Sequence, residues 1–480
     1  MKDYISDLIG LGDPSAQVTD VIQDDDTKYV FIEKKDRYMI CPSCGARMKS
    51  KGKRVKEINH PVLQDGFKLI LAVTCRKWHC EECNFYDHDH FTFVEDGKRN
   101  TTLVPLMVLD KLKDLNVTAR KAAAELNVSD TYVIETFMRF VSLPRLPFPD
   151  IISIDEVYMN FDESDLYAVI IMDFRSGQII DILPNRYTST FEDYFFHIPL
   201  AERSNVKTII SDMYKPYLDF SGTYFTEASS IIDSFHVVSR INTKIKQYIN
   251  QVKRRYKEAD KKKLEEKNYH TNSSHKTIKK SRELRLLDNY SWFLLKNNDD
   301  IDYTPYWRNT RNGGYWFDPI ATEKAFMELD SNFKTIRDLK ELYVRFNKNH
   351  INDSAGAMEE LEQIISQYRA SGIAMFRDIA KTLNTNKQAI TNSFIYIRDE
   401  KYGRKEDMLR RISNGPMEGF NVLPKSLKRN SHGVSNFLYT RNRILWATRK
   451  DPSMLAVPKT RKEVHNNTGK KRGPYNKKDN

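Results

Sequence analysis

The stretch IISIDEVYMNFDESDLYAVIIMDFRSGQIIDILPNR, residues 151–186, decides the fold of the central part of the chain. It contains three short runs rich in β-branched and other apolar residues, at 151–155, 166–174 and 178–183. Such runs are typical of β-strands, and Arg-Ser-Gly at 175–177 is a suitable hairpin turn between the last two. We therefore expect three consecutive strands here.

The residues that follow alternate between helix and strand signals. STFEDYFFHI (189–198) predicts a helix, VKTIISD (206–212) a strand, the residues from Met213 a second helix, and ASSIIDSFHVV (228–238) a further strand. Three strands followed by helix, strand, helix and strand is the order of an RNase H-like core, in which an antiparallel meander precedes parallel strands joined by crossover helices. We expect such a core here.

Two aspartates stand where this fold would bring strands together. Asp155 closes the first predicted strand and Asp212 closes the fourth, and these strands are neighbours in an RNase H-like sheet. Adjacent carboxylates repel unless cations lie between them, and Mg²⁺ prefers oxygen ligands while keeping positions open for phosphate and water. Two such ions can assist a phosphoryl displacement. Either aspartate alone could be an ordinary turn former, so the prediction depends on their joint placement.

A third acidic ligand is expected on a helix, and NGPMEGFN at 414–421 supplies one. Asn-Gly-Pro suits a helix start, and Glu418 falls in the first turn, where an acidic residue can also serve only the helix dipole. Five basic residues downstream are expected to meet DNA phosphates on either side of a cut. They are Lys425, Lys428, Arg429, Arg441 and Arg443.

Four of the five cysteines form two closely spaced pairs, Cys41-x-x-Cys44 and Cys80-x-x-Cys83. Two such pairs supply the four thiolates of a closed structural Zn²⁺ site, and a strand expected at 68–73 completes a small zinc ribbon. The alternative is four buried thiols without a metal. Four further residues are close enough in sequence to replace a ligand but are not assigned as ligands: Cys75, His79, His88 and His90.

The segment TARKAAAELNVSDTYVIETFMRFV, residues 118–141, fits two short helices joined by a tight turn. Leu126 precedes a turn at Asn127, Ser129 is a suitable N-cap, and apolar residues then recur at helical spacing. In helix-turn-helix proteins, a second helix placed in this way reads the DNA major groove. A plain helical hairpin without a binding role is the alternative.

Composition narrows the class of protein. The 480 residues suggest about three domains, and 40% hydrophobic residues are enough to build their cores. Lys and Arg number 77 against 65 Asp and Glu, and the net charge of +12 favours a polyanionic partner such as nucleic acid, although a basic protein without such a partner is the alternative. Without an apolar run of membrane-spanning length, we expect no membrane partner and a cytoplasmic, nucleoid-associated protein.

These patterns predict an α/β multidomain protein. The expected order is a zinc-binding domain at 1–100, a helix-turn-helix domain at 101–145, an RNase H-like catalytic core at 150–240 and 406–450, a helical insertion at 241–405 that interrupts this core, and a basic tail at 451–480. The Pro-rich LPRLPFPD at 143–150 is the expected linker before the core. The charged residues after the core's last strand fit solvated helix faces.

Several of these blocks resemble the ISL-three family of insertion-sequence transposases, along most of the chain. The similar blocks are SIDEVY (153–158), IIDILPNR (179–186), IISDMYKPY (209–217), IIDSFHVV (231–238) and ISNGPMEGFNVLPKSLKRNSHGVSNFLYTRNRIL (412–445). The resemblance implies a DDE transposase in which Asp155, Asp212 and Glu418 are the catalytic ligands of Mg²⁺ (or Mn²⁺). The long insertion fits the 206 positions (418 − 212) between the last two acids.

The resemblance also implies partners. The N-terminal modules would bind double-stranded DNA at the terminal inverted repeats of the element, the target DNA would be a second substrate, and the chain would act as a homodimer on DNA. Asp233 and His236 would assist near the metals or orient the DNA, with a purely structural histidine as the alternative. The sequence departs from the family at Val157-Tyr158-Met159, where a more basic stretch is usual, and at Pro424, which should shorten or kink the helix after Glu418.

Two other functions compete with this interpretation. A catalytically idle, domesticated relative would keep the zinc and helix-turn-helix parts and act as a DNA-binding regulator. Three retained acids facing a polyanion argue against a pure binding protein. A nuclease or resolvase on the same fold would share the metals, and only strand transfer separates it from a transposase.

Overall fold

The computed structural model describes residues 5, 7–61, 67–271, 280–310, 313–398 and 409–466. The chain forms two compact units. Unit 1 comprises Met1–Arg145, Val157–Ala168 and Asn421–Asn480, and unit 2 comprises Leu146–Glu156 and Val169–Phe420. Within the described ranges we find no helix with both the length and the apolar character needed to cross a membrane.

Unit 1 begins with a five-stranded sheet. Its strands are β1 (Ala16–Asp24), β2 (Thr27–Lys34), β3 (Lys49–His60), β4 (Lys68–His79) and β5 (Tyr86–His88), in the order β1-β2-β4-β3 with β5 paired to β4. The strand expected at 68–73 is the first half of β4, and Leu71 and Val73 are fully buried in the core of this sheet. Lys49 pairs with His79, which brings both cysteine pairs to the same end of the sheet.

A helical module follows in unit 1. It contains α2 (Leu103–Lys111), α3 (Ala119–Leu126), α4 (Asp130–Phe140) and, from the far end of the chain, α19 (Phe437–Thr448). The side chains of Thr118 and Ser129 cap α3 and α4, and Asn127 between them is left-handed with φ of 52°. These are the turn and the cap expected from the sequence. Edge-to-face contacts of Phe137 with Tyr439 and Trp446 join α19 to α4.

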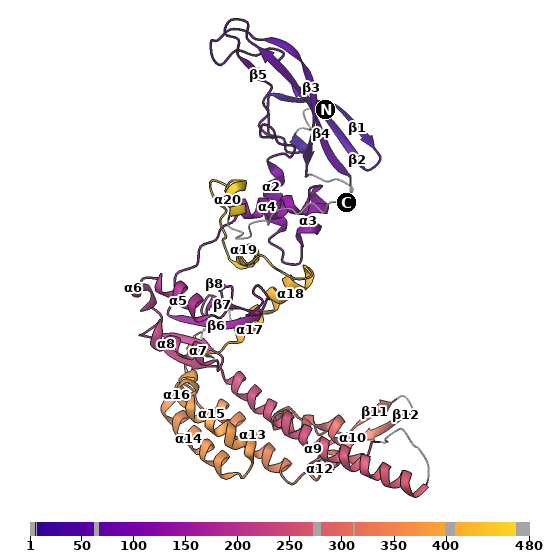
Figure 1. Ribbon diagram of the computed structural model, residues 1–480, viewed down its shortest axis with the longest axis vertical. Coiled ribbons are helices and arrows are strands. Elements are labelled where there is room, and N and C mark those ends of the chain that lie inside the picture. Colours follow the sequence, from indigo (N-terminus) through magenta and orange to yellow (C-terminus); the bar gives the residue numbers. More distant parts are fainter. Residues whose placement is uncertain are drawn as a thin grey trace, which may run out of the picture. The chain divides into compact units, whose positions relative to one another are not determined.

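Unit 2 contains the sheet that begins at residue 151. Its strands are β6 (Ile151–Tyr158), β7 (Tyr167–Asp173), β8 (Ile179–Leu183), β9 (Thr208–Ser211) and β10 (Ser229–Ile232), in the order β10-β9-β6-β7-β8. β7 and β8 are antiparallel, and β9 is parallel to both β6 and β10. Helices α5 (Thr188–Phe196), α7 (Lys215–Leu218) and α8 (Phe220–Thr223) pack on this sheet through a core that includes Phe191, Phe195 and Tyr217 (Figure 1).

Two strands differ from the expected ones. The strand predicted at 228–238 ends at Ile232, because the carboxylate of Asp233 accepts a hydrogen bond from the backbone of Phe235 at 3.1 Å and starts a helix instead. β6 runs on to Tyr158, so Asp155 does not close it as predicted. The reason is that β6 pairs with the short strand β9 only at Ile151–Ser153, whereas β7, its neighbour on the other side, allows it to continue.

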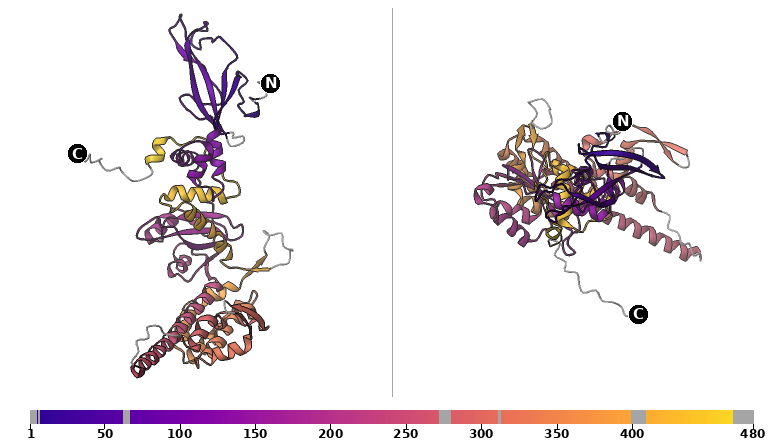
Figure 2. Two further views of the ribbon diagram at one scale, coloured as in Figure 1. Left: turned by 90° about the vertical axis from the view of Figure 1, so that its right-hand side faces the viewer. Right: turned by 90° about the horizontal axis from the view of Figure 1, so that it is seen from above.

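The insertion after β10 is mainly helical. It consists of α9 (Ser234–Thr271), α10 (Arg282–Tyr290), α11 (Trp292–Leu295), α12 (Pro319–Met327), α13 (Phe333–Asn349), α14 (Ser354–Ala370), α15 (Ala374–Thr385) and α16 (Lys387–Thr391), with a hairpin of β11 (Tyr306–Thr310) and β12 (Gly313–Phe317) and a short pair of β13 (Tyr396–Arg398) and β14 (Leu409–Arg411). The long helix α9 runs beside the shorter helices, with which it shares one large apolar core (Figure 2). Of the range 241–405, residues 272–279, 311–312 and 399–405 lie outside the described residues.

The C-terminal part carries α17 (Gly415–Phe420), α18 (Val422–Asn430) and α20 (Arg461–Asn466). The break after Phe420 matches the expected effect of Pro424, which has no N–H to donate to the Phe420 carbonyl. The expected core segment 406–450 is divided, since residues from Asn421 onward fall in unit 1. The expected basic tail is not free at its start, because Lys459 donates its backbone N–H to the Arg139 carbonyl of α4. Residues 467–480 of that tail lie outside the described residues.

Candidate functional site

Three aspartates of unit 2 follow one line across its parallel strands. Ile151 of β6 is opposite Thr208 of β9, and this offset of 57 (208 − 151) equals that between Asp155 and Asp212 (212 − 155). Both aspartates lie two positions beyond the last paired residues, Ser153 and Ile210, and the equal offset is consistent with neighbouring carboxylates, as is the charge of Asp212 that raises the pKa of Asp155. Ile232 of β10 is opposite Ser211, so Asp233 and Asp212 are the next residues along these two chains.

Glu418 of α17 joins this line from a distant part of the chain. The ligand atoms of Asp233, His236 and Glu418 all lie within 4.8 Å of one another. Asp233 is buried, with 3% of its surface exposed, whereas His236 and Glu418 are half-buried. Glu418, which the sequence predicts on a helix, thus lies beside Asp233, the residue that follows β10.

A hydrogen bond explains how α17 reaches this position. The Oδ2 atom of Asp233 accepts a hydrogen bond from the backbone N–H of Asn414 at 2.8 Å, and Asn414 is fully buried. The backbone N–H of Glu418 in turn donates to the Asn414 carbonyl at 3.0 Å. Asp233 therefore holds the residue from which α17 starts, and through it the backbone of Glu418.

The electrostatic environment of Asp155 is that of a crowded acid. Burial raises the pKa of the Asp155 carboxyl, and the negative charges of Asp212 and Glu156 raise it further. The hydrogen bond from the Glu156 N–H and the charge of His236 act in the opposite direction and lower this pKa. The Nε2 atom of His236 is buried and makes no hydrogen bond to any described residue. Several carboxylates around one buried, unsatisfied ring nitrogen fit a divalent cation such as Mg²⁺ or Mn²⁺.

Sequence reasoning missed a second acid and its cation. Glu156 follows Asp155 directly, and its Oε2 atom lies 2.8 Å from the Arg186 guanidinium and 3.4 Å from the Tyr217 hydroxyl. Burial raises the pKa of Glu156, while the hydrogen bond from Arg186 lowers it. Glu156 lies on β6 and Arg186 lies in the loop after β8, within the blocks SIDEVY and IIDILPNR, so an acid in one block and a base in the other were the available signal.

The four paired cysteines come together in unit 1. Cys41 and Cys83 have their sulfur atoms 3.5 Å apart, Cys44 and Cys80 have theirs 3.4 Å apart, and all four sulfurs lie within 4.8 Å of one another. A tetrahedral zinc with bonds of about 2.3 Å separates its sulfurs by roughly 3.8 Å, so the cluster is consistent with a zinc ribbon. The backbone N–H of Cys83 and neighbouring donors lower the pKa of Cys80 to about 7. The backbone hydrogen bonds of Cys44 and Cys83 lower their pKa less than contacts with the other sulfurs and burial together raise it, so Cys80 is deprotonated more easily than either of them.

The two cysteine loops have the same backbone geometry. Cys41 and Cys80 each donate their N–H to a carbonyl five positions later, at 2.8 Å, and each accepts from the residue after the second cysteine, at 2.9 Å. That residue is Gly45 in one loop and Asn84 in the other, and both have positive φ, of 76° and 64°. Two matching loops that converge on one point are consistent with a four-thiolate metal site.

The five basic residues predicted to meet DNA divide into two groups. On α18, Lys425 and Arg429 are exposed, while Lys428 is half-buried with its amino group 3.7 Å from the centre of the Tyr158 ring. On α19 the prediction fails for Arg443, which is 1% exposed and donates from one nitrogen to the carbonyls of Asp114 and Val117, both at 2.7 Å.

Arg441, the other predicted contact on α19, is half-buried and donates to the Leu143 carbonyl at 2.9 Å. Its guanidinium is thus also engaged with the helical module. Both arginines of α19 donate to backbone carbonyls of unit 1 that lie in the loops after α2 and after α4, outside the regular hydrogen bonding of helices and strands.

Comparison with known proteins places the chain in a family. A family model described as transposase, of the DDE type and the ISL3 group, matches residues 152–444, which is more than half of the chain. The transposase for insertion sequence element IS1001 of Bordetella parapertussis is 22% identical over 286 residues, which are 58% of this chain and 63% of that protein. The matched range holds every acid described above. The chain belongs to the ISL3 (ISL-three) family of transposases.

Proposed function

We propose that this chain is a DDE-type DNA transposase whose RNase H-like core is the sheet β6–β10, with Asp155, Asp212 and Glu418 as its catalytic residues. The observation that carries the proposal is the line of acids across three parallel strands together with the Asp233–Asn414 hydrogen bond, which brings α17 to that line. Bound Mg²⁺ or Mn²⁺ would supply charge neutralisation for phosphodiester cleavage and strand transfer.

The protein's own residues have separate tasks in this proposal. Asp155, Asp212 and Glu418 hold the cations, with the unsatisfied ring nitrogen of His236 facing the same group of acids. Asp233 is a positioning residue, because its oxygens already accept backbone hydrogen bonds from Asn414 and Phe235. Arg186 neutralises Glu156, so that this additional carboxylate does not repel DNA.

Unit 1 supplies the DNA-binding modules in this proposal. Helix α4 would lie in the major groove of the terminal inverted repeats as the second helix of a helix-turn-helix, and the zinc module would contact the adjacent DNA. Lys425 and Arg429, exposed on one face of α18, are suited to phosphates. The homodimer on DNA remains a prediction from the resemblance.

The test compares cleavage with binding on DNA that carries the inverted repeats flanking the gene. We expect Asp155→Asn, Asp212→Asn and Glu418→Gln to lose cleavage and strand transfer while binding this DNA as tightly as the wild-type chain. Glu192→Gln, which changes an exposed acid of α5, is the matched control and should keep full activity. Full cleavage by any of the three variants would remove that residue from the site.

The same assay separates the competing functions. A regulator would bind the repeats without any metal-dependent cleavage by the wild-type chain. A nuclease or resolvase would cleave but would not join the released 3′ ends to a target DNA. Joined products that depend on all three acids are expected only from a transposase.

A further inference from the structure

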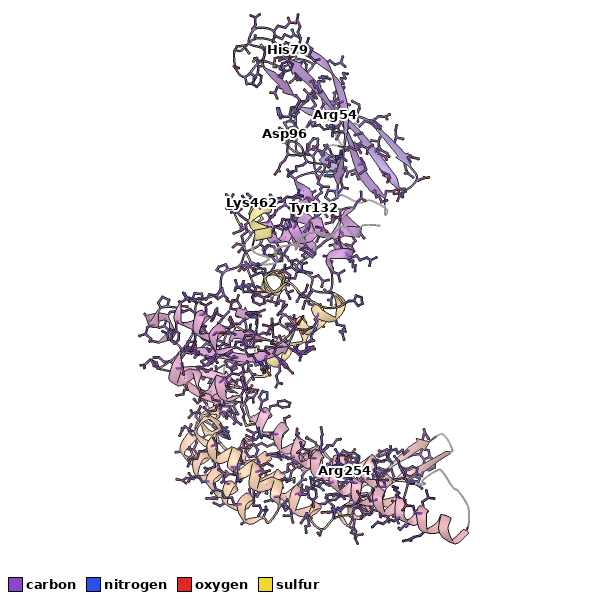
Figure 3. All side chains as sticks on the ribbon, viewed as in Figure 1. Arg54, His79, Asp96, Tyr132, Arg254 and Lys462 are labelled. Atoms are coloured by element: carbon purple, nitrogen blue, oxygen red, sulfur yellow. The ribbon has the colours of Figure 1, made fainter. Side chains whose placement is uncertain are left out.

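A second group of metal-ligating side chains lies in unit 1, away from the four cysteines. It comprises Asp87, His88, His90 and Asp96, on and after strand β5, and Figure 3 labels Asp96 on this module. Strand β5 pairs with β4, where Trp78 is opposite Asp87 and Lys77 opposite His88. None of these four residues has a place in the proposed transposition chemistry.

The residue between the two histidines fixes their direction. Asp89 is buried, with 6% of its surface exposed, and its carboxylate accepts hydrogen bonds from the Arg76 backbone at 2.9 Å and from the Trp78 ring at 2.7 Å. Side chains alternate along an extended chain, so His88 and His90 both face the opposite side. Their rings lie 4.4 Å apart.

Each imidazole bridges the same two carboxylates. His88 Nε2 lies 3.0 Å from Asp96 Oδ1, and His90 Nδ1 lies 3.0 Å from Asp96 Oδ2. The other nitrogens both face Asp87 Oδ1, His90 Nε2 at 2.8 Å and His88 Nδ1 at 3.8 Å. The four side chains thus form a closed ring in which acids and imidazoles alternate.

With one proton on each imidazole, the hydrogen bonds of this ring are incomplete. A neutral imidazole carries one N–H, and the two oxygens of Asp96 can accept one such hydrogen bond from each ring. Two nitrogen lone pairs, on His88 Nδ1 and His90 Nε2, then converge on a carboxylate oxygen of Asp87. With both imidazoles neutral this arrangement repels, and the repulsion is removed either by a metal cation between these three atoms or by a further proton on His90. Burial lowers the pKa of His90, but the hydrogen bonds and charges of Asp87 and Asp96 raise it overall.

We propose that Asp87, His88 and His90 bind a zinc-class divalent cation, and that Asp96 orients the two imidazoles by accepting their other N–H groups. Ligand atoms around a tetrahedral zinc with bonds of about 2.0–2.1 Å are roughly 3.3 Å apart, and the observed 2.8 and 3.8 Å lie on either side of this spacing. A carboxylate behind each metal-binding histidine is the usual arrangement in proteins. Imidazole ligands favour zinc over magnesium.

This cation would have a structural effect on unit 1. Asp96 follows the core residues Phe91 and Phe93, while Asp87 belongs to β5, so the site would tie the segment 87–96 to the edge of β4. Three protein ligands leave a position open for water or a further ligand. The site shares no ligand with the four cysteines, so the two metals can be counted separately.

The experiment counts zinc bound by the full-length chain. The protein is loaded with Zn²⁺ under reducing conditions with excess Mg²⁺ present, freed of unbound metal by gel filtration, and assayed for zinc per chain. We expect His88→Ala/His90→Ala to bind one zinc fewer than the wild-type chain. His197→Gln is the matched control and should lose no zinc, since His197 also faces an aspartate, Asp193, at 3.5 Å, but no second carboxylate among the described residues forms an ion pair with it.

Folding of the variants is followed through the cysteine site. With Co²⁺ in place of Zn²⁺, the thiolate-to-cobalt absorption should be the same in the wild-type chain and in the double variant, which shows an intact zinc module. Asp96→Asn keeps all three ligands and should weaken the second zinc by roughly 10–100-fold without abolishing it. An equal zinc content in the wild-type chain and the folded double variant would overturn the proposal and leave a plain network of ion pairs.

Discussion

Asp233 accepts a hydrogen bond at 2.8 Å from the backbone N–H of Asn414, a residue 181 positions later in the chain. Both residues are buried, and they connect the end of β10 to the start of α17. The whole helical insertion lies between them in sequence. This hydrogen bond therefore connects the chain after the insertion to the sheet that precedes it, and Glu418 comes to lie beside Asp233.

Asp233→Ala should reduce cleavage through the position of Glu418. It leaves the Asn414 N–H buried without an acceptor, which costs about 1–3 kcal/mol of stability. We expect cleavage to fall by roughly 10–100-fold and the Mg²⁺ concentration for half-maximal cleavage to rise, as for other residues that orient metal ligands. Asp233→Asn, whose side-chain oxygen can still accept, should recover part of the activity. An unchanged Mg²⁺ dependence in the folded alanine variant would contradict this role.

Asp155 should destabilise unit 2 at neutral pH when divalent cations are absent. Its pKa is raised by burial, so folding favours the protonated carboxyl, and this stabilisation is present at low pH and is lost as the pH rises through the raised pKa. In EDTA at pH 7, Asp155→Asn should therefore have a higher unfolding midpoint than the wild-type chain, and the difference should shrink toward pH 4. Added Mg²⁺ should stabilise only the wild-type chain. A lower midpoint for the variant in EDTA would refute the argument.

The pair of Glu156 and Arg186 should contribute to the stability of unit 2. Arg186→Ala leaves a half-buried carboxylate without its cation, which we expect to cost about 1–3 kcal/mol in the free energy of unfolding. The double variant Glu156→Gln/Arg186→Ala should recover most of this loss, because no unpaired charge remains. Chemical denaturation of the four proteins in a double-mutant cycle measures the coupling, and additive losses would show that the pair does not interact.

Two arginines of the C-terminal helices should behave in opposite ways. Arg429 is exposed, so Arg429→Ala should weaken DNA binding and reduce the salt-dependence slope by about 0.9 for a lost phosphate contact, with stability unchanged. Arg443 binds two backbone carbonyls in the helical module, so Arg443→Ala should lower the stability of unit 1. Binding titrations at several salt concentrations and thermal unfolding distinguish the two effects. A stable Arg443→Ala with a reduced salt slope would restore that residue as a DNA contact.

Removal of the metal from the four cysteines should unfold the zinc module. The buried residues around Cys41 and Cys80 are few, namely Met48 and Trp78, so the apolar core at this end is small without the metal. Cys44→Ser should therefore lose one zinc per chain and weaken binding of the inverted-repeat DNA, whereas Cys75→Ser, outside the cluster, should keep its zinc. Metal analysis and band-shift assays check both variants, and full zinc retention by Cys44→Ser would contradict the assignment.

Much of the framework follows from local sequence, because short-range physics encodes it. The caps at Thr118 and Ser129 act within three residues of their helices, and the cysteine pairs carry their own loop geometry. The apolar runs from residue 151 onward form strands because they can be buried on both faces. The strand prediction made β6 and β9 neighbours, but their register, and with it the offset of 57 shared by Asp155 and Asp212, is known only from the structure.

Other features were decided only by tertiary structure, since they depend on partners far away in the chain. The sequence contains many glutamates in its last third, and only the buried link from Asp233 to Asn414 brings Glu418 to the acids of the sheet. The sequence predicts Arg443 as a DNA contact, but in the folded chain its guanidinium donates to two backbone carbonyls. The ring of Asp87, His88, His90 and Asp96 likewise exists because Asp89 is buried against β4 and turns both histidines outward. Local sequence patterns determine where helices and strands form. Which distant residues come into contact is determined by buried polar groups, because each of them needs a hydrogen-bond partner.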